Sequence, residues 1–239
     1  MPEDYAAEAQ ARAMNPRMLV EFVDGSKTMI EMSAIAHATG WLPDIAGMHG
    51  PSAPRETLAD VLCAAGDGGV LSRPGCVDYS IGKGVAPGVF VIVKPRHPRL
   101  VERMIDLKVG AGPCFALLRP CHLTSIEAPL SAVRAVLTGV PDMQPIDRPT
   151  AECATLAKRD LKPGEKLGKI GERDYRAWAV TAEALRAVPL GLEEGATVLR
   201  PIAKGEMLTA DNCAPDETLT VTRLRRAQDV PDAAATAAA

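Results

Sequence analysis

Apolar residues in the first 140 positions occur both as short continuous runs and at helical spacing. The runs at residues 88–93 and 114–118 are typical of buried strands, and the run at 18–23 is interpreted as a third strand. Residues 26–38 are predicted to form a helix that ends at Gly40. This order of strands and helices predicts an open sheet with covering helices.

A second long helix is predicted before Gly139, and two starts compete for it. Thr124 and Glu127 fit the capping-box pattern, but a helix begun there includes Pro129, whose missing N–H removes a backbone hydrogen bond. A start near Ala128 puts Pro129 at the first helical position, where the N–H has no helical partner in any case. We therefore expect the later start.

The pattern changes at residues 141–149, where three prolines and three charged residues occupy nine positions. Short strand candidates and turn signals follow. Two segments, 157–167 and 201–209, share the pattern Gly-Glu-x-Leu, in which Gly164 or Gly205 is predicted to adopt a positive φ and the leucine to return to the core. A corner used twice predicts a small, pseudo-symmetric all-β unit.

The predicted fold class is α+β. With 239 residues and 47% hydrophobic content, the chain is long enough for two domains with cores. We expect a helical extension, a mixed domain with an open sheet, a small all-β domain and a disordered alanine-rich tail, at residues 1–14, 15–145, 150–226 and 227–239.

Composition excludes several partners. A formal charge of -3, from 27 basic and 30 acidic residues, gives no field that would attract nucleic acid. No apolar run approaches the ~20 residues that a membrane span needs. We expect a cytoplasmic protein with reduced thiols and without a metal, because no zinc-ligand spacing occurs among its six cysteines, Cys63, Cys76, Cys114, Cys121, Cys153 and Cys213.

Long blocks of the sequence resemble a known family. NPRMLVEFVDGSKTMIEMSAIAHATG, GMHGP, GCVDYSIGKGVAPGVFVIV and RPCHLTSIEAPLSAVRAVL resemble the central catalytic region of homoserine-dehydrogenase-like oxidoreductases, which include a deoxyxylulose-phosphate-reductoisomerase-like group. AKRDLKPGEKL, PLGL and AKGEMLTADN are similar to a SAF domain, which has a β-clip fold. The resemblance covers residues 15–225.

The resemblance implies an NAD(P)-dependent enzyme, whose relatives carry an N-terminal Rossmann domain. The glycines at positions 82, 84 and 88 do not have the dinucleotide spacing, and Pro87 blocks a helix after them. We therefore expect a split oxidoreductase. This chain binds a small hydroxy or amino acid or a sugar phosphate, and a separate Rossmann chain binds NAD(P). By itself, this chain is expected to be inactive and to form an oligomer. The alternatives are a non-catalytic SAF-type ligand-binding or assembly module, and a truncated product.

Lys27 and Glu31 lie one helical turn apart, just after Asp24 and Ser26 at a predicted strand-to-helix junction. In a carbonyl reductase, Lys27 could donate a proton to the substrate oxygen while Glu31 holds it, and Asp24 and Ser26 could bind substrate. The alternative is a surface ion pair. The surrounding block favours the catalytic interpretation.

His122 and Arg119 follow a predicted strand, at the end where open sheets bind ligands. His122 is a candidate proton donor that would share a cleft with Lys27, and Arg119 a candidate clamp for a carboxylate or phosphate. A structural histidine is the equal alternative.

His49 lies in a loop shaped by two glycines and a proline, and Asp78 lies in a similar loop. Both are candidates for substrate binding, and simple turns are the equal alternative. Asp24, Glu31 and Glu127 could share a divalent ion, but their spacing does not require one, so no metal is predicted. In the all-β region, solvated charge is favoured over ligand binding for Lys158, Arg159 and Lys204.

Overall fold

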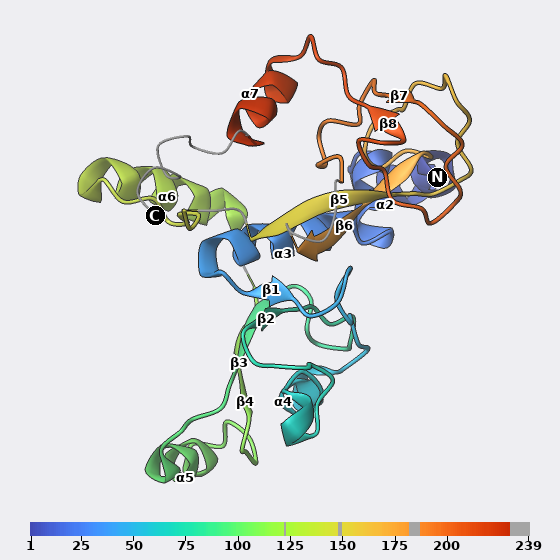
Figure 1. Ribbon diagram of the computed structural model, residues 1–239. Helices are drawn as coiled ribbons and strands as arrows, with labels where there is room; N and C mark the ends of the chain where they lie inside the picture. Colours follow the sequence, from blue (N-terminus) through green and yellow to red (C-terminus); the bar gives the residue numbers. More distant parts are fainter. Residues whose placement is uncertain (122, 148–149, 182–186, 230–239) are drawn as a thin grey trace, which may run out of the picture. The chain divides into compact units, whose positions relative to one another are not determined.

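A computed structural model describes residues 1–121, 123–147, 150–181 and 187–229. The chain forms two compact units: unit 1 consists of Met1–Glu31 and Glu152–Ala239, and unit 2 of Met32–Ala151. Figure 1 labels the elements of both units. Of the helices in the described ranges, none combines the length and the apolarity needed to cross a membrane.

The N-terminal part of unit 1 is helical. It contains η1 (Pro2–Tyr5), α1 (Ala6–Ala11) and α2 (Pro16–Val23), and α3 (Ser26–Thr39) begins there and runs on into unit 2. The helix predicted at 26–38 is confirmed, but the strand predicted at 18–23 is wrong.

Capping explains why the apolar run at residues 18–23 is helical. The Asn15 side chain accepts a hydrogen bond from the Arg17 N–H at 2.9 Å, and Pro16 occupies the first position of α2. Leu19 and Val20 are the buried residues of this helix. A run of six apolar and polar residues is too short for periodicity to separate strand from helix, so the cap decides.

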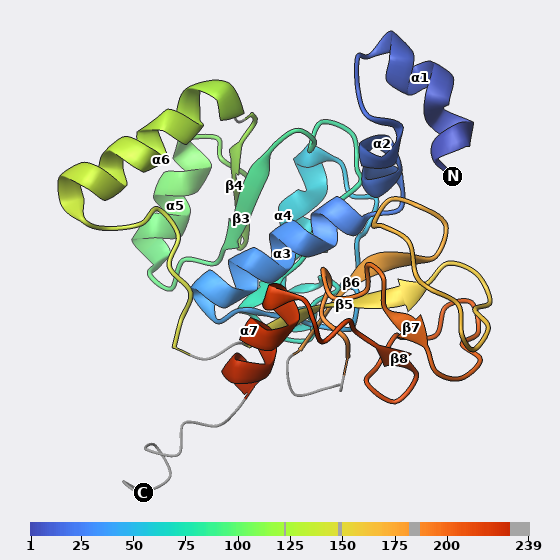
Figure 2. The same cartoon turned by 90° about the horizontal axis from the view of Figure 1, so that it is seen from above.

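The C-terminal part of unit 1 is mostly strand and turn. It contains β5 (Ala151–Ala157), β6 (Tyr175–Thr181), β7 (Thr197–Val198), β8 (Cys213–Ala214) and α7 (Thr220–Asp229). β5 pairs with β6, and β7 pairs antiparallel with β8 (Figures 1 and 2). The core is built from small and aliphatic side chains around Tyr175, including Leu161, Leu167, Ile202 and Leu208.

A two-fold relationship links residues 155–167 to residues 196–208, with each residue matched to the one 41 positions later. Leu161 N–H donates to the Ile202 carbonyl at 2.9 Å, and Ile202 N–H donates to the Leu161 carbonyl at 3.1 Å. Each half therefore hydrogen-bonds to the other half through the same positions.

The glycine turns of the two related segments are also equivalent. Gly164 N–H donates to the Val198 carbonyl at 2.8 Å, and Gly205 N–H donates to the Ala157 carbonyl at 2.8 Å. Both glycines have φ near 85°, a conformation that other residues adopt only with strain. The predicted positive φ at the repeated Gly-Glu-x-Leu corners is confirmed, whereas the β-clip fold stays a prediction.

Unit 2 combines short elements. In chain order they are β1 (Leu42–Pro43), η2 (Arg55–Thr57), α4 (Leu58–Val61), η3 (Ala65–Asp67), β2 (Cys76–Val77), β3 (Val89–Val93), α5 (Pro98–Asp106), β4 (Phe115–Arg119) and α6 (Thr124–Thr138). β1 and β2 pair in parallel, and β3 pairs antiparallel with β4. One face of the β3–β4 hairpin packs on Leu58 and Leu62, because Phe90, Ile92, Ala116 and Leu118 contact that cluster.

The strands predicted at 88–93 and 114–118 are confirmed as β3 and β4. The later start predicted for the second long helix is wrong, because α6 begins at Thr124 and contains Pro129. The Glu127 carboxylate accepts the Leu123 N–H at 3.0 Å, which satisfies one of the free donors at the helix start. Gly139 ends the helix with φ 68°, as predicted.

Candidate functional site

Two aspartates in unit 2 follow a pair of parallel strands. Leu42 of β1 pairs with Cys76 of β2, and the next residues pair likewise, so that Asp44 and Asp78 both come directly after the paired residues. Carboxyl ends of neighbouring parallel strands meet at one edge of a sheet, where α/β proteins commonly bind ligands. The strand geometry therefore brings these two carboxylates together.

The Asp44 carboxylate is a buried acceptor. It receives His49 Nε2 at 2.8 Å and the Ser72 N–H at 2.8 Å on one oxygen, and the Ser72 hydroxyl and the Cys76 thiol on the other. Its side chain is 4% exposed. Burial alone would raise the pKa of Asp44, but the hydrogen bonds from Ser72 and His49 outweigh it and lower the pKa to about 2.

His49 stands on a loop with an unusual backbone. Gly47, Met48 and Gly50 all have positive φ, and Met48 at φ 64° has a side chain that disfavours this conformation. The Asp78 carboxylate holds the loop, because it accepts the N–H groups of His49 at 3.0 Å and Gly50 at 2.9 Å. A side chain at Gly50 would overlap the Tyr79 ring, so the loop lies directly against that ring.

The arrangement defines the chemistry available to His49. Because Asp44 is ionised near neutral pH, its carboxylate accepts a hydrogen bond from the Nε2–H group, and the lone pair of Nδ1 is left for another partner. The His49 side chain is 23% exposed, so it is held in place and still reachable. A histidine oriented by a buried carboxylate is suited to general acid and base catalysis.

The same carboxylate affects Cys76. Burial raises the pKa of the Cys76 thiol, and the neighbouring Asp44 raises it further, while Arg73 has the opposite effect. A thiol with a raised pKa is a poor nucleophile at neutral pH. Cys76 therefore serves as a donor to Asp44.

Lys27 and Glu31 are side by side on α3. Their charged atoms are 3.8 Å apart, the Lys27 side chain is 44% exposed, and its ammonium lies 4.4 Å from the centre of the Phe22 ring. This is the geometry of a surface ion pair with an added cation–π contact. The predicted junction is wrong, since Lys27 follows a helix rather than a strand, and its catalytic role stays a prediction.

Asp24 and Ser26 are occupied within unit 1. The Asp24 carboxylate accepts the Ser26 N–H at 3.0 Å and the Lys158 ammonium at 2.9 Å. The fully buried Ser26 hydroxyl accepts the Ala177 N–H of β6 at 3.0 Å. Both side chains join the start of α3 to the strand region, and their predicted substrate contacts stay untested.

Arg119 is exposed at the end of β4 and forms an ion pair with Glu127 of α6. His122 lies outside the described residues, so its predicted pairing with Lys27 is untested. Besides Lys27 with Glu31 and Asp24 with Ser26, the structure brings together His49 and Asp78. Around His49 it adds Asp44, Ser72 and Cys76, which the sequence patterns did not indicate.

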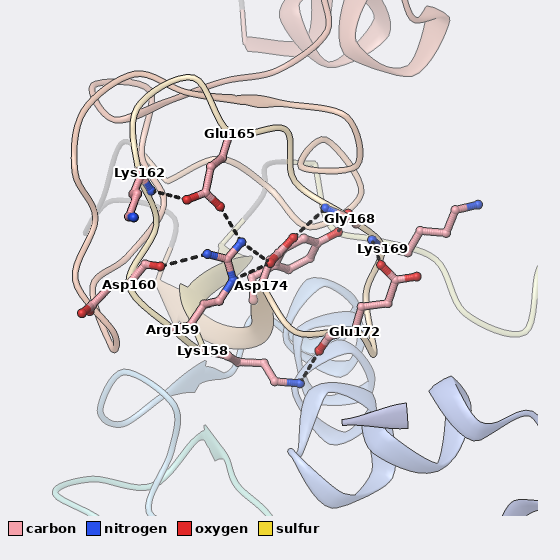
Figure 3. Close-up of polar contacts among 10 residues, drawn as sticks. Lys158, Arg159, Asp160, Lys162, Glu165, Gly168, Lys169, Glu172 and Asp174 are labelled. Carbon is pink, nitrogen blue, oxygen red and sulfur yellow. Dashed lines mark hydrogen bonds and ion pairs between the residues drawn. The ribbon is translucent and has the colours of Figure 1, made fainter. Parts of the chain in front are cut away.

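Two basic residues of the strand region, Lys158 and Arg159, are bonded within the protein (Figure 3). The Arg159 guanidinium lies 2.5 Å from Glu165 and 2.8 Å from Asp174, and the hydrogen bond from Arg159 holds the pKa of Glu165 below its ordinary value. Lys158 donates to Asp24 and to the Glu172 carbonyl. These hydrogen bonds and ion pairs hold the segment 159–174 in place.

Within the part of the chain that the structure describes, no cluster of three or more His, Cys, Asp or Glu could hold a metal ion. The glycine-rich loop at 82–88 does not fit a dinucleotide either. A side chain at Gly82 would overlap the Ala53 carbonyl, and one at Gly88 would press on the carbonyls of Val85 and Arg119. These glycines make room for the protein's own backbone, and a strand, β3, follows them instead of a helix.

Comparison with family models identifies a match over the first part of the chain. The family model described as Oxidoreductase DRL, catalytic domain, matches residues 1–128, which is more than half of the chain. The chain belongs to this family of oxidoreductase catalytic domains. The matched region contains β1, β2 and the whole cluster around His49. Among curated proteins, none matched.

Proposed function

We propose that this chain provides the substrate-binding and proton-transfer part of an NAD(P)-dependent oxidoreductase. The pair formed by His49 and the buried, ionised Asp44 carries the proposal, because it lies in the matched family region and can exchange a proton. Membership in a family of oxidoreductase catalytic domains supplies the reaction class.

The proposed role of His49 is the proton half of the redox reaction. Oxidation of an alcohol or amine removes a hydride from carbon and a proton from oxygen or nitrogen. Nδ1 of His49 accepts that proton, and the resulting cation is stabilised by Asp44; the reverse reaction returns the proton to a carbonyl oxygen or an imine nitrogen. Asp78 fixes the position of the ring by holding the backbone of His49.

The resemblance to homoserine-dehydrogenase-like enzymes implies NAD(P) as the hydride carrier and a small hydroxy or amino acid or a sugar phosphate as substrate. Because the glycine-rich loop at 82–88 does not fit a dinucleotide, the proposed NAD(P) site lies on a separate Rossmann-type chain. The similarity to a SAF domain supports an accessory role for the strand region.

The test begins with nucleotide binding. The purified chain should give no saturable change in NADH or NADPH fluorescence at micromolar concentrations. The tagged chain is then recovered from its source cells with its bound partners, and the complex is assayed for NAD(P)H-dependent reduction of small keto acids, aldehydes and sugar phosphates.

Variants of the complex test the proton transfer. His49→Gln should lower kcat/KM by ~10²-fold or more, the scale of a lost general acid or base. Asp44→Asn should have a comparable effect, because an amide can donate to Nε2 and so moves the proton to Nδ1. His97→Gln is the matched control, since His97 caps α5 at an exposed position and should retain full activity. Full activity of His49→Gln would refute the assignment.

A ligand-binding module is the second candidate, and an open groove on unit 1 supports it. The groove has a volume of about 500 Å³ and lies between α7 and residues 189–192. Leu190, Leu192, Val221 and Leu224 give it an apolar wall, and the Arg225–Glu152 ion pair, 2.7 Å long, gives it a polar one. If no redox activity accompanies the complex and small molecules raise the Tm of the wild type but not of Leu224→Trp, this function is favoured.

A further inference from the structure

Two cysteine thiols meet inside unit 2. Cys63 lies just after helix α4, and Cys114 directly precedes strand β4. Because α4 packs on one face of the β3–β4 hairpin, these two positions come together although they lie far apart in the chain (Figure 1). The thiols hydrogen-bond to each other, and both cysteines are free. The fold therefore places two reduced sulfur atoms in contact.

The pair is shielded from water. Cys63 is 5% exposed and Cys114 is 8% exposed. The Cys63 Sγ atom also lies 3.4 Å from the Asp60 carbonyl oxygen and 3.6 Å from that of Asp67, and the ion pair between Lys94 and Asp67 lies beside both thiols. Each thiol has its reaction partner already in place, which favours a bond between the two over a bond to a second molecule.

The surroundings of the pair make its oxidation slow and its disulfide stable. Burial is the main cause, with Cys63 and Asp67 nearby, that raises the pKa of the Cys114 thiol to about 11. Because the thiolate is the form that reacts, the pair reacts slowly. A disulfide is easily reduced when its thiolates are stabilised, and here Cys114 is not. The pair is therefore suited to a lasting oxidation and not to rapid catalytic cycling.

The backbone of Cys63 is connected to the cluster around His49. The Leu71 N–H donates to the Cys63 carbonyl at 3.2 Å. The next residue, Ser72, donates its N–H to the Asp44 carboxylate at 2.8 Å, and Asp44 accepts His49 Nε2. A covalent bond at Cys63 therefore restrains the segment from which Ser72 reaches Asp44.

We propose that Cys63 and Cys114 are an oxidation site that closes into a disulfide and restrains the segment 63–72. A hydroperoxide is the oxidant, because hydrogen peroxide is small enough to reach the pair when unit 2 opens locally. One cysteine sulfur attacks the peroxide, the O–O bond breaks, a sulfenic acid forms and water leaves. The second thiol attacks the sulfenic sulfur, the S–O bond breaks, and a second water leaves with the proton of that thiol. Two thiols thus become one disulfide, and one peroxide becomes two waters.

Peptide mapping of the full chain tests the pairing. The exposed Cys121 is first replaced by serine in every protein, so that it cannot link two chains. After treatment with hydrogen peroxide at about pH 8, digestion without reductant should give one linked peptide that contains Cys63 and Cys114. Cys114→Ala should abolish it. Cys213→Ala, which removes a buried cysteine of unit 1, is the matched control and should leave it unchanged.

The mapping needs no variant at the pair to fold, so its result is decisive. Cys63 and Cys114 that stay reduced after prolonged treatment of the folded chain, or a mixture in which other pairings prevail, would overturn the proposal. The inference goes beyond the proposed proton transfer and does not rest on it. His49→Gln should therefore oxidise like the parent chain, whether or not His49 proves to be catalytic.

Two further measurements test the restraint. The disulfide closes a loop of about 50 residues, so the Tm of unit 2 should rise by about 10 °C, followed by Trp41 fluorescence in a Trp178→Phe background. Amide hydrogen exchange at Leu71 and Ser72 should slow by ~10-fold or more. Dithiothreitol should reverse both changes. Unchanged exchange at Leu71 and Ser72 in the fully oxidised chain would contradict the proposed restraint.

Discussion

The Thr155 hydroxyl donates a hydrogen bond to the Glu193 carboxyl group at 2.9 Å, and both residues are completely buried in unit 1. Glu193 also accepts the Gly191 N–H at 2.8 Å. Burial raises the pKa of Glu193 to about 8, because these hydrogen bonds only partly offset the loss of water. Glu193 is therefore a neutral acid in the folded protein at pH 7.

The first prediction follows from the proton that the Glu193 carboxyl group carries in the folded protein. From about pH 4.5 to 8 the folded chain keeps it and the unfolded chain releases it, so stability falls as the pH rises. The Glu193→Gln side chain stays neutral and can hydrogen-bond to Thr155. Relative to the wild type, its free energy of unfolding should therefore rise by up to about 1 kcal/mol for each pH unit in this window. Urea unfolding at pH 5 and pH 8 measures the gain. Glu194→Gln, at an exposed neighbouring position, should show no such trend.

The second prediction concerns the two equivalent glycine corners of unit 1. Gly164 and Gly205 share the same φ, and a side chain at either would meet nothing within 4 Å, so only backbone strain penalises substitution. Each Gly→Ala change should destabilise unit 1 by about 1 kcal/mol, and each Gly→Asn change by less, since Asn tolerates a positive φ better. In a Trp41→Phe background, the fluorescence of Trp178 in β6 reports the unfolding of this unit. Unequal costs at the two corners would argue against their equivalence.

The third prediction concerns Asp44 and acid. Its pKa is about 2 in the folded chain and near 3.8 when unfolded, so its stabilising effect is complete above about pH 5 and is lost as the pH falls toward 2. Asp44→Asn should cost unit 2 about 2 kcal/mol at neutral pH and flatten the stability profile below pH 4. The fluorescence of Trp41, measured in a Trp178→Phe background, follows this transition. Asp106→Asn, at an exposed position of α5, is the control and should change neither quantity.

The fourth prediction contrasts two lysines. Lys158 is 19% exposed and lies 2.9 Å from the mostly buried Asp24, whereas Lys27 is largely exposed and lies 3.8 Å from Glu31. Lys158→Met should cost about 1–3 kcal/mol because it strands the Asp24 carboxylate, and Lys27→Met should cost less than about 0.5 kcal/mol. A double-mutant cycle with Asp24→Asn should show strong coupling for Lys158. If Lys27→Met proved the more damaging to folding, its surface placement would be wrong.

Local signals in the sequence predicted much of the secondary structure. Continuous apolar runs identified β3 and β4, and the repeated Gly-Glu-x-Leu identified both corners of unit 1, because a tight turn leaves little choice of residue. The errors arose where two local signals competed. At residues 16–23, the apolar run suggested a strand, while Asn15 and Pro16 specified a helix start. At α6, the helix begins one turn earlier than predicted and includes Pro129.

The site was harder to predict because its residues meet only in three dimensions. His49 and Asp78 were singled out from their loops, and the structure joins them. Asp44, which orients His49, lies in an ordinary-looking segment, and its partner Ser72 is 28 residues away. The available clue was that Asp44 and Asp78 each follow a short apolar stretch, but strands of two residues are too brief to read from periodicity.

The discontinuous make-up of unit 1 sets an order on its assembly during translation. The partner of Asp24, Lys158, lies 134 residues later in the chain, so their ion pair forms late in synthesis. The hydrogen-bond partners of Asp44 lie within 32 residues of it. Unit 2 is an uninterrupted segment and can fold as soon as it leaves the ribosome, with domains generally folding as units during synthesis. The helices at the start of the chain can contact one another early, but the contacts of Asp24 and Ser26 with the strand region form only after residues 158–177 have emerged.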